Sequence, residues 1–143
     1  MESRRILVVD DDPQILKMFT RTLLAAGYAV DAARSGTEAI RLIRETSVDL
    51  LVLDLSMPEP DGLEVLKLLA AVRPGLKVIA VTGMIPEALL RAARLAGAVA
   101  TLSKPTPLRT LLETVEEVLS YEPRETEGAG LAKRRYLSAL KNP

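Results

Sequence analysis

Short aliphatic runs without polar alternation constrain the fold of this chain more than any other feature. The clearest are Arg5–Val9 and Val48–Leu53, and the second leads directly into Asp54. A strand that is apolar along its length is buried on both faces, which is typical of a parallel sheet covered by helices on each side. Three further runs have the same strand-like character: Tyr28–Ala33, Lys77–Val81 and Ala98–Leu102.

Amphipathic segments follow these runs and predict a helix after each strand. The segment Pro13–Ala26 carries apolar residues at helical spacing, and Gly27 follows it as a stop signal. Ser35 is placed to cap a helix that continues through Thr46, with Glu38 in the position of a capping box. The other expected helices are Leu63–Val72, Pro86–Ala96 and Pro107–Tyr121. Strand–helix units joined by right-handed crossovers predict a doubly wound α/β domain, in which ligands bind at the carboxyl ends of the strands.

Length and composition predict one domain of ordinary size, since the chain has 143 residues. The domain is expected to cover residues 1–121. Residues 122–143 are expected to form a linker and a short C-terminal tail that could include a helix, because proline and glycine interrupt any apolar stripe just after Tyr121. Lys plus Arg and Asp plus Glu are equal at 19 each, so the overall charge does not favour nucleic acid as a partner.

The absence of cysteine and histidine narrows the chemistry. It excludes disulfides, zinc thiolate sites and thiol nucleophiles, and it removes the usual general base near neutral pH. A metal site in this chain must use oxygen ligands, which favours Mg²⁺, Ca²⁺ or Mn²⁺ over zinc or copper. The sequence shows neither a signal peptide nor a membrane span, so a cytoplasmic protein is expected.

Chemically active side chains follow four of the predicted strands. Asp10 and Asp11 follow the first strand, Asp54 the third, Thr82 the fourth and Lys104 the fifth. Taken singly, each is ordinary as a turn or surface residue, but together they place three carboxylates, a hydroxyl and an ammonium at one sheet edge. Carboxylates about 4 Å apart repel by roughly 4 kcal/mol at an effective dielectric near 20, so a cation is expected among them. Mg²⁺ suits such an oxygen cluster and commonly engages a phosphate.

This set of side chains is sufficient for phosphoryl chemistry. A carboxylate beside Mg²⁺ can attack phosphorus and form an aspartyl phosphate, while Thr82 and Lys104 contact the phosphoryl oxygens. Catalysis of phosphoryl transfer consists mostly of such positioning and charge stabilisation. Asp12 has a structural role instead, because an aspartate directly before a proline is typical of a helix N-cap.

Four stretches of the sequence resemble the receiver domain of bacterial two-component response regulators. They are ILVVDDDP, DLLVLDLSMPEPDG, VIAVTG and LSKP, and the resemblance covers about Arg4–Ser120. It implies a flavodoxin-like (βα)5 fold with a five-stranded parallel sheet in the order 2-1-3-4-5. It also implies a signalling role, in which a partner histidine kinase or a phosphotransfer protein presents phosphohistidine, since this chain has no histidine of its own.

The resemblance also implies how the metal is held. Asp54 resembles the family's phosphoacceptor and lies beside the metal. Asp11 resembles the direct ligand of Mg²⁺, and Asp10 a ligand that acts directly or through water. The backbone carbonyl of Ser56, two residues after Asp54, is similar to the family's third protein ligand.

Thr82 matches the switch hydroxyl that moves toward the phosphoryl group, and Lys104 matches the lysine that pairs with it. The bond between Lys104 and Pro105 resembles one that is often cis in this family. Two positions depart from the family pattern: Thr101 stands where Tyr or Phe is common, and Thr106 stands where Phe is usual. A threonine cannot move aromatic bulk, so the read-out is expected to differ from that of an aromatic switch.

Phosphorylation is expected to change a surface that binds an unknown output partner or a second copy of the chain, without direct binding to nucleic acid or membrane. The chain is expected to catalyse only its own phosphorylation and dephosphorylation. One alternative is a pseudo-receiver, which binds partners without being phosphorylated. A phosphohydrolase is disfavoured because Ser56 occupies the place of the second acid. A flavodoxin-like cofactor site is disfavoured because three aspartates would repel a phosphate.

Overall fold

The computed structural model describes residues 3–58, 62–83 and 87–121. In this part of the chain strands and helices alternate, as the apolar runs predict. The strands are β1 Arg5–Val9, β2 Ala29–Ala33, β3 Leu50–Asp54, β4 Lys77–Thr82 and β5 Ala100–Ser103. The helices are α1 Pro13–Ala25, α2 Gly36–Glu45, α3 Gly62–Val72, α4 Glu87–Ala96 and α5 Leu108–Ser120.

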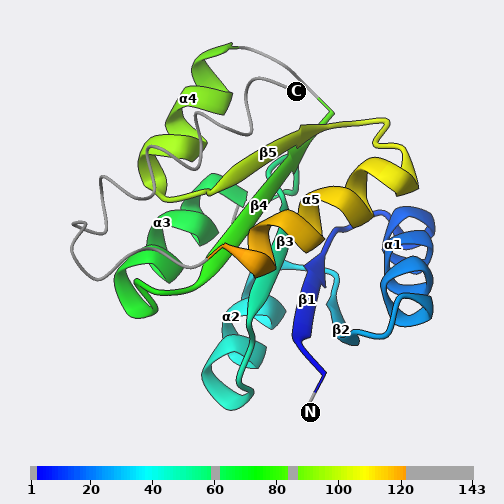
Figure 1. Cartoon of the computed structure of the whole chain (residues 1–143). Coiled ribbons are helices and arrows are strands. Elements are labelled where there is room, and N and C mark those ends of the chain that lie inside the picture. The colour runs from blue at the N-terminus through cyan, green and yellow to red at the C-terminus, as the bar shows by residue number, and fades with distance from the viewer. Residues whose placement is uncertain (1–2, 59–61, 84–86, 122–143) are drawn as a thin grey trace.

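The five strands form one parallel sheet in the order β2-β1-β3-β4-β5 (Figure 1). The chain passes from β1 to its neighbour β2 and then crosses back to β3 on the other side of β1. The direction of the connections therefore reverses between β1 and β3, and such a switch point is where doubly wound folds bind ligands. The predicted fold class and strand order are confirmed.

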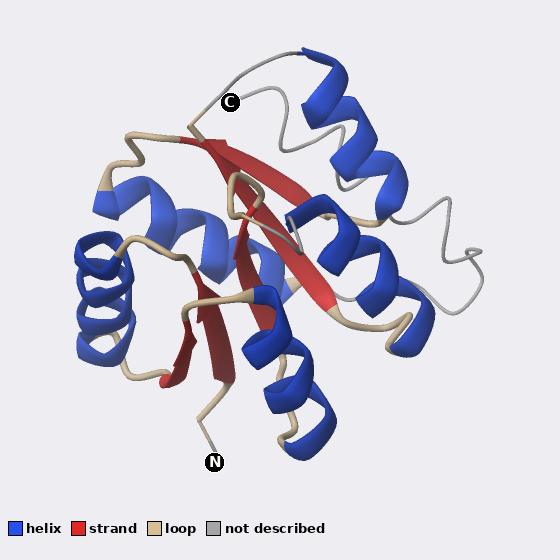
Figure 2. Ribbon diagram, turned by 180° about the vertical axis from the view of Figure 1, so that it is seen from behind, coloured by secondary structure: helices blue, strands red, loops and turns tan. Residues whose placement is uncertain are grey.

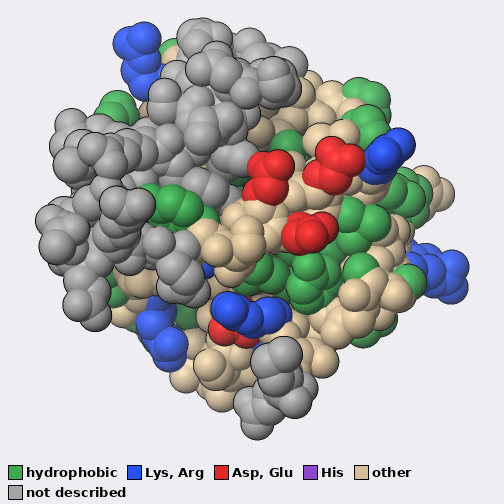
Figure 3. Space-filling model, viewed as in Figure 1, with side chains coloured by type: hydrophobic (Ala, Val, Ile, Leu, Met, Phe, Trp, Pro, Cys, Tyr) green, Lys and Arg blue, Asp and Glu red, His purple; other side chains and the backbone are tan. Residues whose placement is uncertain are grey.

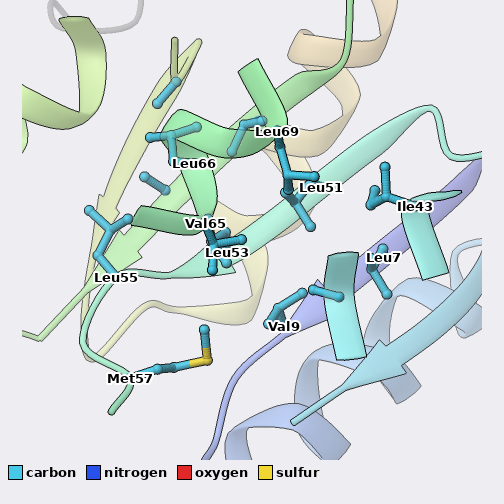
Figure 4. Close-up of a cluster of buried hydrophobic side chains, with 14 of the residues drawn as sticks. Leu7, Val9, Ile43, Leu51, Leu53, Leu55, Met57, Val65, Leu66 and Leu69 are labelled. Atoms are coloured by element: carbon cyan, nitrogen blue, oxygen red, sulfur yellow. The ribbon is translucent and has the colours of Figure 1, made fainter. Parts of the chain in front are cut away.

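Helices cover both faces of the sheet, with α1 and α5 on one face and α2, α3 and α4 on the other (Figures 1 and 2). Each strand divides its side chains between the two layers with a period of two. In β1, Ile6 and Val8 pack with α1 and α5, whereas Leu7 and Val9 pack with the opposite helices. Figure 4 shows this second layer, where Leu66 of α3 faces the strands. Because each buried aliphatic side chain contributes about 1.5–3 kcal/mol, both layers hold the sheet in place.

Local capping residues fix the helix ends next to the sheet. The side chain of Asp12 caps α1, as its place before a proline predicts. Ser35 caps α2 by accepting a hydrogen bond from the Glu38 N–H at 3.2 Å. The Glu38 carboxylate accepts the N–H of Arg34, one residue before the cap, so the predicted capping box forms with a shifted partner. Gly27, after α1, has a φ of 99°, a backbone conformation that is costly for residues with a side chain.

Strand β5 begins two residues later than predicted. The N–H of Ala98 donates to the carbonyl of Ala93 at 3.0 Å, so this residue caps the C-terminus of α4 instead of starting the strand. Strand β3 likewise begins at Leu50 instead of Val48, and it includes Asp54. The other bounds agree with the predictions to within one or two residues, which is the ordinary uncertainty of helix and strand ends. Residues 59–61 and 84–86 and the predicted linker and tail, 122–143, lie outside the described residues.

The surface mixes both signs of charge. On the face that Figure 3 shows, acidic and basic side chains are interspersed with hydrophobic ones. Part of this mixture comes from pairs along single helices, such as Arg109 and Glu113 on α5, whose side chains lie 3.1 Å apart. Within the described ranges, no helix has the length and apolar character needed to cross a membrane.

Candidate functional site

The predicted site residues meet at the carboxyl edge of the sheet, beside the switch point. Asp10 follows β1, Asp54 ends β3, Thr82 ends β4 and Lys104 follows β5. Thr82 is paired in register with Ser103, so the parallel strands bring Lys104 level with the other site residues. Asp10, Asp54 and Thr82 are at most 2 % exposed, which is far more burial than turn residues usually have. Their burial sets them apart from ordinary turn residues, which are exposed.

Asp10, Asp11 and Asp54 form an acidic cluster. Each offers one carboxylate oxygen, and these oxygens all lie within 4.8 Å of one another. Asp10 and Asp54 are buried, whereas Asp11 is exposed. Two buried charges and one accessible charge suit a hard cation such as Mg²⁺, which binds one or two carboxylates and keeps several waters. The donor set therefore fits the predicted metal, and neither imidazole nor thiolate exists in this chain to favour zinc.

The three consecutive aspartates of the first loop have different roles. The Asp12 side chain points back to its own helix and accepts the N–H of Gln14 at 2.9 Å. The backbone N–H of Asp12 donates to Oδ1 of Asp10 at 2.9 Å, and this bond fixes the position of the Asp10 carboxylate. Of these three aspartates, only Asp10 and Asp11 therefore join Asp54 in the acidic cluster, and the predicted capping role of Asp12 is confirmed.

Lys104 lies between the two buried carboxylates. Its Nζ is 3.0 Å from Oδ2 of Asp10 and 3.2 Å from Oδ2 of Asp54. The sequence predicted a metal ion as the cation that offsets the repulsion between the carboxylates. It did not reveal that the Lys104 ammonium also offsets this repulsion. Oδ2 of Asp54 is buried and forms this ion pair with Lys104. No group within the described residues makes a hydrogen bond of good geometry to this oxygen. That oxygen therefore retains capacity for a further partner.

Burial and neighbouring charges shift both groups. Burial raises the pKa of Asp54, and the charge of Asp10 adds to the rise, while the hydrogen bond from Ser56 and the charge of Lys104 oppose it. Burial lowers the pKa of Lys104, but the hydrogen bond to Asp10 and the charges of Asp54 and Asp10 outweigh it, so this pKa is raised. The site thus holds a protonated lysine beside a carboxylate whose ionised form is costly to bury.

Ser56 joins two of the site residues. Its N–H donates to Oδ1 of Asp54 at 2.9 Å, and its Oγ lies 3.2 Å from Oγ1 of Thr82. The sequence predicted a role only for the backbone carbonyl of Ser56. The contact between the Ser56 and Thr82 hydroxyls was not predictable, because these residues are far apart along the chain. Thr82 is fully buried, whereas Ser56 is exposed at the rim of the site.

The end of β5 differs from the usual pattern, as the sequence predicts. Thr101 lies in β5 opposite Ala80 of β4 and is half-buried. The Oγ1 of Thr106 donates to the carbonyl of Ser103 at 2.8 Å. The peptide bond between Lys104 and Pro105 is cis, in agreement with the resemblance. Small polar side chains therefore stand on both sides of Lys104.

Gly62 lies against the end of β3, which its place in the sequence does not reveal. It is the first residue of α3. A Cβ atom at this position would collide with the backbone carbonyl oxygen of Asp54 and with the Cα of Leu55. The start of α3 thus lies directly against the end of β3. An Asp-Gly pair is a common turn signal, and nothing in it indicates such a contact.

The comparisons with known proteins bear on the family of the chain. A family model described as the response regulator receiver domain matches residues 6–116. The chain belongs to this family. Receiver domains are signalling domains of two-component systems, in agreement with the role expected from the sequence. The predicted family is therefore confirmed.

Individual relatives support the same conclusion. The receiver domain is 36 % identical over 124 residues to the transcriptional regulatory protein GlrR of Escherichia coli K12, covering 85 % of this chain and 28 % of that protein. It is 36 % identical over 132 residues to the response regulator MprA of Mycobacterium tuberculosis H37Rv, covering 92 % and 57 %. The chain thus spans between about a quarter and just over half of these curated relatives.

Solved structures show the same fold. A CheY-like receiver domain protein from Methanospirillum hungatei JF-1 superposes with a TM-score of 0.80 at 36 % sequence identity. The match covers 82 % of this chain and 94 % of that one. The receiver domain described here therefore corresponds to nearly the whole of a solved receiver protein.

Proposed function

We propose that this receiver domain accepts a phosphoryl group on Asp54 from a phosphohistidine of a histidine kinase or a phosphotransfer protein. The observation that carries the proposal is the buried Asp54 carboxylate, which has Lys104 at 3.2 Å and the acidic cluster around it. A carboxylate with a raised pKa is a better nucleophile than an ordinary aspartate, and this one is held in place by the Ser56 N–H.

In the proposed step, a carboxylate oxygen of Asp54 forms a bond to phosphorus while the bond from phosphorus to the donor imidazole nitrogen breaks. The electron pair of the broken bond stays on that nitrogen, which then takes a proton. The Lys104 ammonium contacts one phosphoryl oxygen, and the Thr82 hydroxyl donates to another. These contacts stabilise charge on the three phosphoryl oxygens, which is the main task of a protein in this chemistry.

The residues proposed to hold Mg²⁺ are Asp10, Asp11 and Asp54, together with the backbone carbonyl of Ser56. The ion would supply charge neutralisation between the carboxylates and the incoming phosphoryl group. Asp10 remains anchored by the Asp12 N–H and by Lys104. Asp11, which is exposed, is the carboxylate free to adjust to the ion.

The read-out is proposed to run through β4 and β5. Thr82 ends β4, and its carbonyl accepts the Lys104 N–H at 2.8 Å, so a movement of Thr82 reaches the residues after β5. The surface formed by α4, β5 and α5 would then change its affinity for an output partner or a second copy of the chain. Thr101 replaces the usual aromatic ring, so this change is proposed to proceed through backbone movement. Residues 1–121 would form the receiver domain, and 122–143 a linker and tail.

Phosphorylation with acetyl phosphate tests the proposal. In the presence of Mg²⁺ the protein is expected to gain a single phosphoryl group, measured by intact mass spectrometry, because Asp54 displaces acetate from phosphorus. Asp54→Asn is expected to lower this signal by about 20-fold or more, since an amide is not a competent nucleophile. Asp31→Asn, which changes a carboxylate in β2 outside the site, should be labelled like the wild type. Full labelling of Asp54→Asn, or no labelling of the wild type, would contradict the proposal, and the second result would favour the pseudo-receiver.

Mg²⁺ itself is expected to stabilise the folded domain. A ligand that binds only the folded state at ten times its Kd adds about 1.4 kcal/mol to the free energy of unfolding. We therefore expect Mg²⁺ to raise the Tm, measured by differential scanning calorimetry against a K⁺ control of equal ionic strength. Asp11→Asn should remove most of this rise, because it deletes one carboxylate of the acidic cluster without unpacking the core. An equal rise in this variant would show that Mg²⁺ acts elsewhere.

A further inference from the structure

A groove opens at the amino edge of the sheet, at the opposite end of the strands from the acidic cluster. The groove has a volume of about 250 Å³. Its walls come from the end of α2, the residues before β3 and the loop between α3 and β4. The described residues that line it are Ile43, Val48, Arg73, Pro74, Gly75 and Leu76. Because most of these side chains are apolar, the groove suits an apolar occupant better than an ion.

Contacts between its walls fix the shape of the groove. The Arg73 guanidinium donates to the carbonyl of Ile43 at 3.2 Å, which joins the loop after α3 to the end of α2. Val48 and Leu76 are only half-buried, although both pack against the layer of side chains beneath α2, α3 and α4. A Cβ atom on Gly75 would meet no atom within 4 Å, so the space beside this loop is open. An occupant would therefore find the groove already formed and would cover apolar surface.

The described part of the chain ends beside this groove. Its last residue, Tyr121, follows α5, and the Tyr121 carbonyl accepts a hydrogen bond from Nζ of Lys77 at 2.8 Å. Lys77 is the first residue of β4 and directly follows Leu76, which lines the groove. Figure 1 shows the end of α5 beside the start of β4. The segment 122–143 therefore starts at the same edge of the sheet as the groove.

We propose that residues 131–140 of this chain dock in the groove through their apolar side chains. Leu137 and Leu140 are three residues apart, and Tyr136 and Leu140 are four apart, a spacing that places side chains on one face of a helix. Residues 122–130 can span about 30 Å when extended, so they allow the docking segment to reach the groove. Attachment to the same chain gives an effective concentration in the millimolar range, at which even a weak contact is occupied.

Pairs of engineered cysteines test the proposed proximity, because the chain has no cysteine of its own. Ser47→Cys places an exposed thiol at the rim of the groove, and Ser138→Cys places one in the docking segment. Ser103→Cys is the matched control, since Ser103 is also exposed but ends β5 at the carboxyl edge of the sheet. In the dilute full chain, the pair at 47 and 138 is expected to form an intramolecular disulfide about tenfold faster than the pair at 103 and 138. Intact mass after thiol alkylation measures both rates.

Further substitutions test the apolar contact itself. Leu137→Asn combined with Leu140→Asn should slow the pair at 47 and 138 to the rate of the control pair, because the apolar surface is lost. Thr126→Asn, between α5 and the docking segment, should leave the faster rate unchanged. Gly75→Leu fills the groove from its other wall and should slow the same pair. Gly75 lies outside the left-handed region and has open space at its Cβ, and thermal melts check that this variant folds.

The outcomes decide between this occupant and others. Equal rates for the two cysteine pairs would overturn the proposal, because the segment would then not favour the groove. A faster rate at 47 and 138 that persists in the double asparagine variant would also overturn it. Disulfide-linked dimers on a non-reducing gel, in place of the intramolecular product, would assign the groove to a second copy of the chain. These measurements use no phosphoryl donor, so their result is independent of the function proposed for Asp54.

Discussion

Gly62→Ala is expected to destabilise the domain by about 3 kcal/mol, the upper end of the range for overpacked sites. The added Cβ would meet the backbone carbonyl of Asp54 and the Cα of Leu55, and a backbone cannot rotate away as a side chain does. Either α3 must move off the end of β3, or β3 must shift at Asp54. Urea unfolding followed by circular dichroism measures the loss of stability.

Gly75→Ala is the matched control, because no atom lies within 4 Å of the place its Cβ would occupy. This variant should unfold within about 0.5 kcal/mol of the wild type, as surface substitutions usually do. If Gly62→Ala were as stable as Gly75→Ala, the close approach of α3 to Asp54 would be wrong. The destabilised variant should also take up phosphoryl groups more slowly under conditions where it is still folded, since the Asp54 carbonyl is part of the collision.

Lys104→Met is expected to lower the free energy of unfolding by about 3–5 kcal/mol at pH 8 without Mg²⁺, the usual cost of removing one partner from a buried ion pair. The substitution leaves Asp10 and Asp54 buried side by side without their shared cation. Methionine fills a similar volume, so the loss of stability reflects charge more than packing. Chemical unfolding at several pH values measures it, and Lys67→Met on the exposed face of α3 serves as the control.

The loss should depend on pH with a definite sign. Burial already raises the pKa of Asp54, and removal of the nearby ammonium raises it further. A carboxyl group whose pKa is higher in the folded state destabilises the fold when it is ionised, above its folded pKa, and this cost is released as pH falls toward its unfolded value near 4. The difference in stability between Lys104→Met and the wild type should therefore shrink as the pH is lowered from 8 toward 4.

Two results would contradict this account of Lys104. A loss that is independent of pH would indicate that the lysine stabilises the fold through its aliphatic stem. A loss that grows on acidification would mean that the carboxylates do not repel each other. Addition of Asp54→Asn to Lys104→Met should recover much of the stability, because one of the two unpaired charges is then gone.

The fold was predictable because its strongest signals are local. The unbroken apolar runs around Leu51 and Leu7 required burial on both faces, and the two packed layers supply that burial. Asp12 was predictable for the same reason, since a cap depends only on its next few residues. The predicted start of β5 was wrong because Ala98 is as apolar as a strand residue, and its bond to Ala93 shows that it caps α4 instead.

The content of the site was predictable, but its internal contacts were not. Sequence reasoning named Asp10, Asp54 and Lys104 because acids and a base follow buried strands. It assigned the neutralising charge to a metal, since nothing in the sequence shows that the Lys104 side chain reaches back across the sheet edge. The Ser56 hydroxyl and the Gly62 contact depend on how the loop after β3 folds over the sheet, which no local pattern encodes.

The sheet separates two packed layers that share no side chains, because alternate residues of each strand belong to different layers. Substitutions that repack Leu66 on one side and Val115 on the other are therefore far enough apart for their energetic effects to add. A lineage could redesign the helices that meet one partner while preserving those that meet another. The backbone of the sheet thus separates the sequence changes that each layer accumulates. Substitutions at the carboxyl edge of the sheet are the ones expected to affect both layers.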